Sequence, residues 1–478
     1  MPLSTRGVTG FLKPGQRQQH GHRPGAAIGL PISETLANNA KVFFFFRNQI
    51  PGRRNCHCTG ATRTRATTKE NAMHLRALRP YIFAVLMTLP GLGLRFVHSD
   101  ISPLVVVLLS GMAILGASFL LTWACEVAQM DIPQAVAVAV VAFIAVLPEY
   151  AVDMYFTWMA GQHPESAYSH YAIANMTGAN RLLIGVGWSS IVLIFARRFH
   201  SSVSLADDKR TDVLFLGMAT LYALIIPIKG SLTWVDGLAL LAIYAWYICI
   251  IARRPVEEEE PEGPAAVLAH FARKIRLRSV IGIFLFAALV ILCNAEPFSE
   301  SLVASGKLLG VNEFLLVQWL APIASEAPEF IVAVMFAMRG NAALALGSLL
   351  SSKLNQWTLL VGMIPGVYAV SSGSLNPPIN LDNHQLQEIL LTAGQSLFAV
   401  ALLTGLRLHM RAAFWLLALF AAQLLSPLYD AQLEALLGLP HDPLRLHSFY
   451  AQVYLALAGI LLLKNWRNVW KLRQGFKV

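Results

Sequence analysis

The stretch "ASEAPEFIVAVMF", Ala324 to Phe336, decides the fold, because it places charge and proline inside an apolar segment. That segment runs from Val311 to Met338 and is long enough to cross a bilayer. A carboxylate at bilayer depth costs roughly 2.5–3.5 kcal/mol on insertion scales. Pro328 also removes a backbone hydrogen bond. Glu326 and Glu329 therefore need compensating partners inside the membrane.

The composition sets the class of protein. Of 478 residues, 56% are hydrophobic and only 13% are charged, whereas soluble domains carry about 25% charged residues. Apolar stretches of bilayer length recur along the chain, which predicts an all-α polytopic membrane protein. The net charge of +10 requires no nucleic acid, because the basic residues lie mostly at segment ends and in the tails.

Twelve membrane spans follow from the apolar pattern. The predicted ranges are 79–97, 102–128, 132–161, 167–196, 211–229, 232–252, 279–306, 311–338, 341–369, 386–406, 412–430 and 449–464. Residues 1–72 are rich in Arg, Gly and Thr, and we interpret them as a disordered tail or a mis-assigned start before Met73. Residues 253–278 form a charged linker, and residues 449–478 form the last span with a basic tail.

Lysine and arginine gather at alternate ends of these spans. The residues are Arg76, Arg79, Arg197, Arg198, Lys209, Arg210, Arg253, Arg254, Arg273, Lys274, Arg276, Arg278, Arg339, Arg407, Arg411, Lys464, Arg467, Lys471, Arg473 and Lys477. With twelve crossings they all fall on one side, which predicts a cytoplasmic linker and cytoplasmic termini. We expect the location to be a bacterial inner (plasma) membrane.

An internal repeat explains the opening stretch. "LPEYAVDMYF", Leu147 to Phe156, can be laid on "APEFIVAVMF", Ala327 to Phe336, so that Glu149 matches Glu329. Each copy lies in the second span of a five-span unit. The units cover 102–252 and 279–430, and one extra helix lies at each end. Since five is odd, the second unit is inverted, as in many secondary transporters with midplane ion sites.

We expect the two Pro-Glu pairs to meet at the axis between the units. Each proline would break its helix and free carbonyl groups, which is tolerable only beside a cavity or an ion. Two carboxylates alone would repel each other, whereas a bound cation lets both stay ionised. The alternative is two chance proline kinks with hydrogen-bonded glutamates, and their register in inverted halves argues against it.

A second polar element follows each Pro-Glu span, at Ala172–Gly187 and Ala345–Gly362. Small residues there allow close helix packing. The oxygen-bearing side chains exceed what packing needs, and hard cations bind such oxygens. They are Asn175, Asn180, Ser348, Ser351, Ser352, Asn355 and Gln356.

At these residues the sequence resembles the cation/calcium exchanger superfamily, which includes the sodium/calcium exchangers. Each half of that family carries Gly-Thr-Ser-x-Pro-Glu and then Gly-Asn-x-x-Gly-Ser-Asn-x-x-Asn/Asp. The resemblance covers roughly residues 102–369 and implies that Glu149 and Glu329 bind the transported cation. The further ligands that we predict are Asn180, Ser325, Ser352, Asn355 and Gln356.

Several positions depart from the family pattern. Ala179 and Leu183 replace ligands in the first half, and Lys353 replaces an Asn in the second. Arg181 and Lys353 bring positive charge near the site, which would weaken Ca²⁺ binding to its usual six to eight oxygens. Lys353 either competes with the cargo or faces away toward the interface.

The resulting prediction is a secondary antiporter that moves Ca²⁺ or Na⁺ in exchange for Na⁺ or H⁺. A sodium/proton exchanger without calcium transport and a cation channel are the alternatives. Lys353, Asp153 and Glu326 are candidates for proton or charge coupling. We expect no enzyme activity and no cofactor beyond the transported cation, with the lipid bilayer as partner; the sequence favours no oligomeric state.

Overall fold

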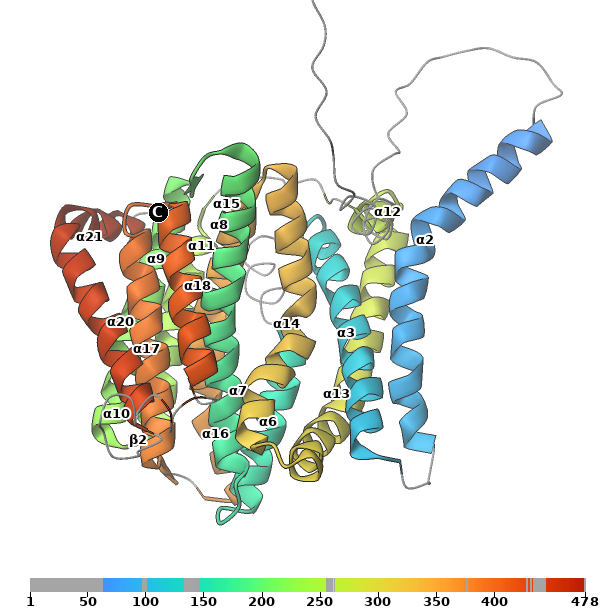
Figure 1. Ribbon diagram of the computed structural model, residues 1–478. Coiled ribbons are helices and arrows are strands. Elements are labelled where there is room, and N and C mark those ends of the chain that lie inside the picture. Colours follow the sequence, from blue (N-terminus) through green and yellow to red (C-terminus); the bar gives the residue numbers. More distant parts are fainter. Residues whose placement is uncertain are drawn as a thin grey trace, which may run out of the picture. The chain divides into compact units, whose positions relative to one another are not determined.

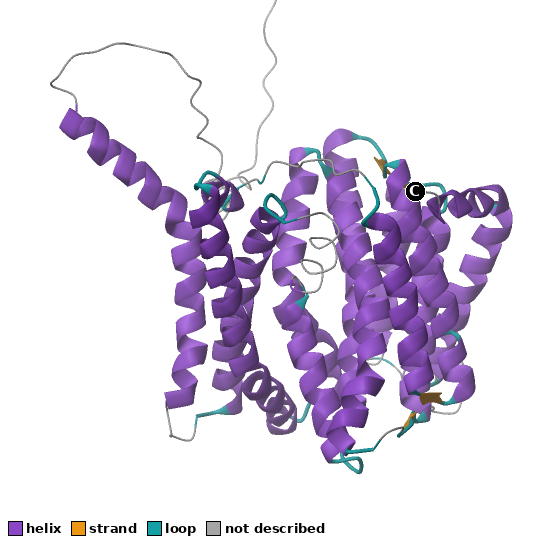
Figure 2. Cartoon of the chain, turned by 180° about the vertical axis from the view of Figure 1, so that it is seen from behind, coloured by secondary structure: helices purple, strands orange, loops and turns teal. Residues whose placement is uncertain are grey.

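The computed structural model describes residues 63–96, 101–132, 146–254, 263–374, 377–426 and 444–476, with the single residues 144, 261, 429 and 432. These residues are mainly helical (Figures 1 and 2). The predicted tail, residues 1–72, lies largely outside the described residues. Helix α2 begins at Arg63, inside the range predicted as tail.

The first five-span unit is a run of helices with one short strand on each side of its fourth span. Its elements are α3 (Pro103–Ala128), α6 (Leu147–Gln162), α7 (Tyr168–Leu182), the π-helix η4 (Leu183–Trp188), α8 (Ser189–Phe199), β1 (Val203–Ser204), η5 (Asp207–Lys209), α9 (Arg210–Ala223), α10 (Ile225–Lys229), β2 (Ser231–Leu232) and α11 (Trp234–Ile251). Most of the range before α6, residues 133–143 and 145, is outside the described residues, so the predicted span 132–161 is only partly seen.

The second unit repeats the order of spans and strands, without counterparts to η5 and α10 among its described residues. It consists of α13 (Arg273–Leu309), α14 (Glu313–Arg339), α15 (Ala342–Asn355), the π-helix η6 (Gln356–Leu360), α16 (Val361–Ser372), β3 (Ile379–Asn380), α17 (Asn383–Leu403), β4 (Arg407–Leu408) and α18 (Met410–Leu425). The remaining elements flank or join the units. They are α2 (Arg63–Gly93), η2 (Leu94–Phe96), α12 (Ala265–Ala269), α20 (Arg445–Lys464), α21 (Trp466–Leu472) and η8 (Arg473–Phe476).

The strands display the two-fold relation between the units. Strand β1 pairs antiparallel with β4, and β2 pairs antiparallel with β3. In each sheet, the strand that follows the third span of one unit meets the strand that follows the fourth span of the other. The third span of each unit also contains a π-helical stretch, η4 or η6. Such stretches are rare and concentrate at functional sites.

Eight of the described helical segments are long and apolar enough to cross a membrane. Helices lie in all twelve ranges that the sequence predicts, although the range 132–161 is only partly described. The all-α membrane fold with inverted repeats is therefore confirmed, whereas the count of twelve spans stays a prediction.

Helices α2, α3 and α13 pack together as one bundle (Figure 1). Their contact is rich in small residues, including Ala113, Ala117 and Ala287, which let helix backbones approach. At Gly116 a Cβ atom would lie 2.6 Å from the carbonyl oxygen of Ala84, so only glycine fits this contact. Helices α6 and α14 connect this bundle to the other helices (Figure 1).

The linker between the units is partly folded. Residues 255–260 and 262 are outside the described residues, but α12 packs its Ala265 and Leu268 onto the α3 and α13 bundle. Helix α13 then begins at Arg273, six residues before the predicted start. Arg276 donates two hydrogen bonds to Asp131, at 2.7 Å and 2.6 Å, and thereby ties the start of α13 to the end of α3.

Candidate cation site

Glu149 lies where helix α6 begins. Pro148 occupies the first turn of this helix, where its missing N–H group costs nothing. Glu149 follows in the same turn and is only 3% exposed. The proline thus sets the helix start and fixes a carboxylate at a buried helix end.

Glu329 lies in a continuous helix, so the predicted helix break at Pro328 is wrong. Helix α14 runs through both Pro322 and Pro328. Proline leaves the carbonyl group four residues earlier without its usual partner. For Pro322 that carbonyl belongs to Gln318, and Gly178 of α7 packs against it so closely that a Cβ atom would lie 1.8 Å from the oxygen. Tertiary packing therefore covers the carbonyl freed by Pro322. The helix also continues through Pro328.

The two Pro-Glu glutamates come together between the units. Glu149 lies close enough to Glu329 and Gln356 to interact electrostatically with both. Gln356 Nε2 also donates to Glu326 Oε1 at 2.9 Å. Ser352 Oγ donates to Glu329 Oε2 at 2.9 Å. Thus α6, α14, α15 and η6 bring their polar side chains to one place.

Lys353 belongs to the same cluster and does not face the membrane surface. Its side chain is fully buried, and Nζ donates to Asn180 Oδ1 at 2.5 Å. The ammonium group also lies 4.3 Å from the centre of the Trp357 ring and is attracted by Glu326 and Glu149. The Lys353 amine therefore stands beside the carboxylates.

Other predicted ligands make different bonds. Ser325 Oγ donates to carbonyl groups of its own helix, both at 3.3 Å. Asn355 Oδ1 accepts a hydrogen bond from Tyr150 at 2.8 Å, which joins α15 to α6. Asp153 accepts from Asn175 at 3.2 Å, one turn below Glu149. The ligand roles of Ser325 and Asn355 stay predictions, as does the role of Asp153 in proton or charge coupling.

Four buried oxygen atoms of the cluster accept no hydrogen bond from the described residues. They are Glu149 Oε1, Asp153 Oδ2, Glu326 Oε2 and Gln356 Oε1. Buried polar atoms in proteins are almost always satisfied, so such a group of unsatisfied oxygens requires an explanation. Carboxylate and amide oxygens are the ligands of hard cations, and the arrangement is suited to bind one.

The sequence did not lead us to Glu388, which is the acidic partner of the buried Arg181 side chain. The guanidinium of Arg181 forms a buried ion pair with Glu388 of α17 and lies 5.1 Å from the Trp319 ring centre. Gln318 Nε2 also donates to Glu388, at 2.8 Å. Arg181 therefore has its own counter-ion. The available signal was that Glu388 is the one acidic residue in the predicted span 386–406.

This chain has inverted five-span units with glutamates between them inside the membrane. That architecture is typical of secondary transporters. The sodium/calcium exchanger protein family matches residues 102–253 and 279–428. The chain belongs to this family, and it is a cation antiporter and not an enzyme. The search of curated proteins gave no match.

Solved structures of other exchangers are similar to this chain. The H⁺/Ca²⁺ exchanger CAX is 40% identical, with a TM-score of 0.75, and the match covers 86% of this chain and 98% of that chain. The sodium-calcium exchanger NCX_Mj is 19% identical, with a TM-score of 0.45, over 67% of this chain and 97% of that chain. A second NCX_Mj structure is 18% identical, with a TM-score of 0.44, over 72% and 99%.

Proposed function

We propose that this protein exchanges Ca²⁺ for protons, with Glu149, Glu326 and Glu329 as the groups that hold both ions in turn. The observation that carries the proposal is the set of unsatisfied carboxylate and amide oxygens between the two units. Three glutamates outnumber the one ammonium of Lys353, so the ionised cluster is negatively charged and attracts a divalent cation. The 40% identical relative is itself described as an H⁺/Ca²⁺ exchanger.

Exchange follows from the chemistry of the carboxylates. With a cation bound, the glutamates remain ionised, because the cation offsets their mutual repulsion and their desolvation. Without the cation, buried carboxylates that face one another take up protons. The same oxygen atoms cannot hold protons and Ca²⁺ together, so loading one ion releases the other.

Sodium/proton exchange is the second candidate. Lys353 occupies part of the cluster, and few oxygens remain for a Ca²⁺ ion that prefers six to eight ligands. A monovalent cargo would need fewer oxygens and less negative charge.

Ion flux into vesicles that contain the purified full chain distinguishes these functions. Gradients of Ca²⁺, Na⁺, K⁺ and pH are varied one at a time. Calcium uptake driven by a pH gradient, without Na⁺, is the expected result. Uptake of Na⁺ alone against protons would establish the second candidate, and uncoupled flux of several cations would indicate a channel.

Substitutions test the proposed site residues. Glu149→Gln and Glu329→Gln should each abolish coupled flux while the protein still reaches the membrane. Glu296→Gln is the matched control, because Glu296 is 57% exposed and pairs with Arg95 away from the cluster. Flux near the wild-type level in both site variants would refute the assignment.

The proposal places the chain in a bacterial inner (plasma) membrane with both termini in the cytoplasm. Its support is the one-sided distribution of Lys and Arg. The β1 and β4 sheet fits this arrangement, since it pairs Ser204, which follows Arg198 by six residues, with Arg407. Beyond the transported ions, the proposed mechanism needs no cofactor.

A further inference from the structure

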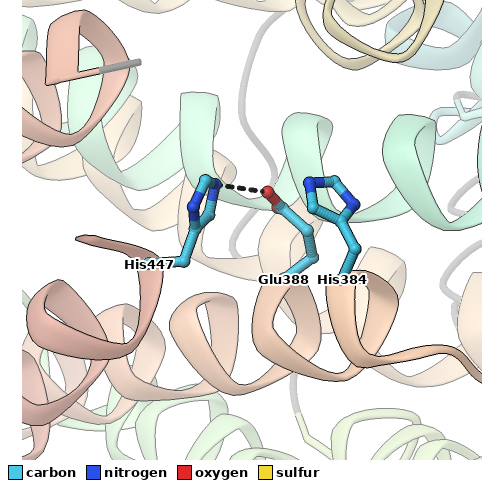
Figure 3. Close-up of side chains that lie close together, drawn as sticks. All are labelled: His384, Glu388 and His447. Carbon is cyan, nitrogen blue, oxygen red and sulfur yellow. Dashed lines mark ion pairs between the residues drawn. The ribbon is translucent and has the colours of Figure 1, made fainter. Parts of the chain in front are cut away.

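Two histidines flank the Glu388 carboxylate at the beginning of α17 (Figure 3). His384 and Glu388 are four residues apart on this helix and so share one face. His447 comes from α20, which packs along α17. One ligand atom from each of the three side chains can be chosen so that all lie within 4.8 Å of one another. His447 Nε2 and Glu388 Oε1 are 3.0 Å apart.

The surroundings leave one Glu388 oxygen directed toward the histidines. Oε2 is bound by Arg181 and by Gln318. Oε1 is paired only with His447 among the described residues. In metal sites, neighbouring hydrogen bonds orient the ligating carboxylate in this manner.

We propose that His384, Glu388 and His447 bind a transition-metal dication such as Zn²⁺. Two imidazoles and one carboxylate form a ligand set of the kind that binds Zn²⁺ in proteins. Zinc–ligand distances of about 2.0–2.2 Å require the three groups to close slightly around the ion. We expect the histidine side chains to rotate toward the Glu388 carboxylate, since both are only partly buried.

The site is chemically different from the proposed cargo site. It offers one carboxylate oxygen that Arg181 and Gln318 do not bind, Glu388 Oε1, whereas Ca²⁺ prefers six to eight oxygen ligands. Imidazole nitrogens favour Zn²⁺, Ni²⁺ and Cu²⁺. Because Arg181 neutralises Glu388, attraction by net charge contributes little, and the imidazoles determine which ion binds.

The ion can reach the site from the aqueous phase at the end of the helix bundle where α17 begins. Glu388 is 1% exposed, but the His447 side chain is 17% exposed. His170 and Asp382, whose side chains lie 3.5 Å apart, stand near His384 at the start of α17. Both are substantially exposed, and the Asp382 carboxylate adds negative charge at this end.

Cobalt provides a spectroscopic test that does not depend on transport. Co²⁺ is titrated into the tag-free full chain in detergent, in a Cys56→Ser/Cys58→Ser background that removes the tail thiols. We expect one equivalent to give the visible absorption of low-coordinate Co²⁺, and one equivalent of Zn²⁺ to abolish it. His384→Asn and His447→Asn should each weaken binding at least about tenfold.

Controls separate this site from other histidines and from loss of folding. His163→Asn changes an exposed histidine at the end of α6 and should leave the titration unchanged. Glu388→Gln is avoided, because it would leave Arg181 buried without its counter-ion. Thermal unfolding with and without Zn²⁺ gives a second measurement, in which only the wild type and His163→Asn should be stabilised.

Titrations that are identical in wild type, His384→Asn and His447→Asn would overturn the proposal. So would a Zn²⁺ stabilisation that survives in both variants. A failure to observe calcium flux would not affect the outcome of the cobalt titration, because the Co²⁺ absorption reports only on metal binding at this site.

Discussion

The Nζ atom of Lys353 lies 2.5 Å from Oδ1 of Asn180, and this hydrogen bond joins the third spans of the two inverted units. Both residues are fully buried. The same ammonium group is attracted by Glu149 and Glu326. Lys353 therefore interacts with the same carboxylates that a cation would bind. The hydrogen bond to Asn180 fixes the position of the Lys353 side chain.

The first prediction concerns this lysine. Lys353→Asn should alter the pH dependence of flux and raise the affinity for a divalent cation, because it removes a positive charge that competes for the glutamates. Lys353→Arg keeps the charge and serves as the matched variant. Initial flux rates are measured from pH 5.5 to 8.5, at several Ca²⁺ concentrations. If Lys353→Asn keeps the wild-type pH profile and ion preference, the lysine has only a structural role.

The second prediction concerns topology. A membrane-impermeant maleimide should label Glu165→Cys in intact cells and His270→Cys only after permeabilisation, in a background without the native cysteines. Glu165 is exposed between α6 and α7, and His270 is exposed between α12 and the basic start of α13. The excess of Lys and Arg places the second loop in the cytoplasm. Labelling of His270→Cys from outside would contradict the proposed orientation.

The repeat and the membrane class were predictable from the sequence because their signals are local. Span length and the Pro-Glu pairs can be read in short windows. The match of Glu149 to Glu329 needs only a comparison of two such windows. Inversion then follows because each repeat unit has an odd number of spans, five.

The partners of the buried charges were not predictable, because they lie far apart in the chain. Lys353 and Asn180 are separated by 173 residues, and Arg181 and Glu388 by 207. The continuity of α14 through Pro328 was predicted wrongly for a related reason. Whether a proline breaks a helix depends on what neighbouring helices place around the freed backbone, and no local pattern records that.

The third prediction concerns the contact of Gly178 with α14. Gly178→Ala should destabilise the protein by about 1–3 kcal/mol or more, because its Cβ atom would lie 1.8 Å from the Gln318 carbonyl oxygen, a backbone atom that cannot rotate away. Gly282→Ala is the control, since no atom lies within 4 Å of its added Cβ. Thermal unfolding in detergent measures both. Equal stability of the two variants would show that α7 and α14 do not pack this closely.

The fourth prediction concerns the pH dependence of stability at Asp131. Its hydrogen bonds from Arg276, with the attraction of Arg276 and Arg273, hold the pKa of Asp131 below its usual range. Because the pKa is lower in the folded state, the pair stabilises the fold above the unfolded pKa of about 3.9 and loses this effect as the pH falls. An ion pair at a helix end contributes up to about 1 kcal/mol.

Asp131→Asn should therefore lower the unfolding temperature at pH 7 and have less effect near pH 3. Asp208→Asn, at an exposed position before α9, is the control and should change little at either pH. A loss of stability in Asp131→Asn that is the same at both pH values would mean that the charge of Asp131 is not what stabilises this junction.

The last prediction concerns the buried ion pair of Arg181 and Glu388. Glu388→Gln should lower the free energy of unfolding by about 3–5 kcal/mol, because it leaves the Arg181 guanidinium buried without a counter-ion. Arg181→Gln should cost a similar amount by leaving the Glu388 carboxylate unpaired. The double variant Arg181→Gln/Glu388→Gln removes both charges, so neither partner is left ionised in a site that excludes water. It should therefore be more stable than either single variant, and unfolding by denaturant in detergent measures the whole cycle. Additive losses in the double variant would show that the two charges do not depend on each other.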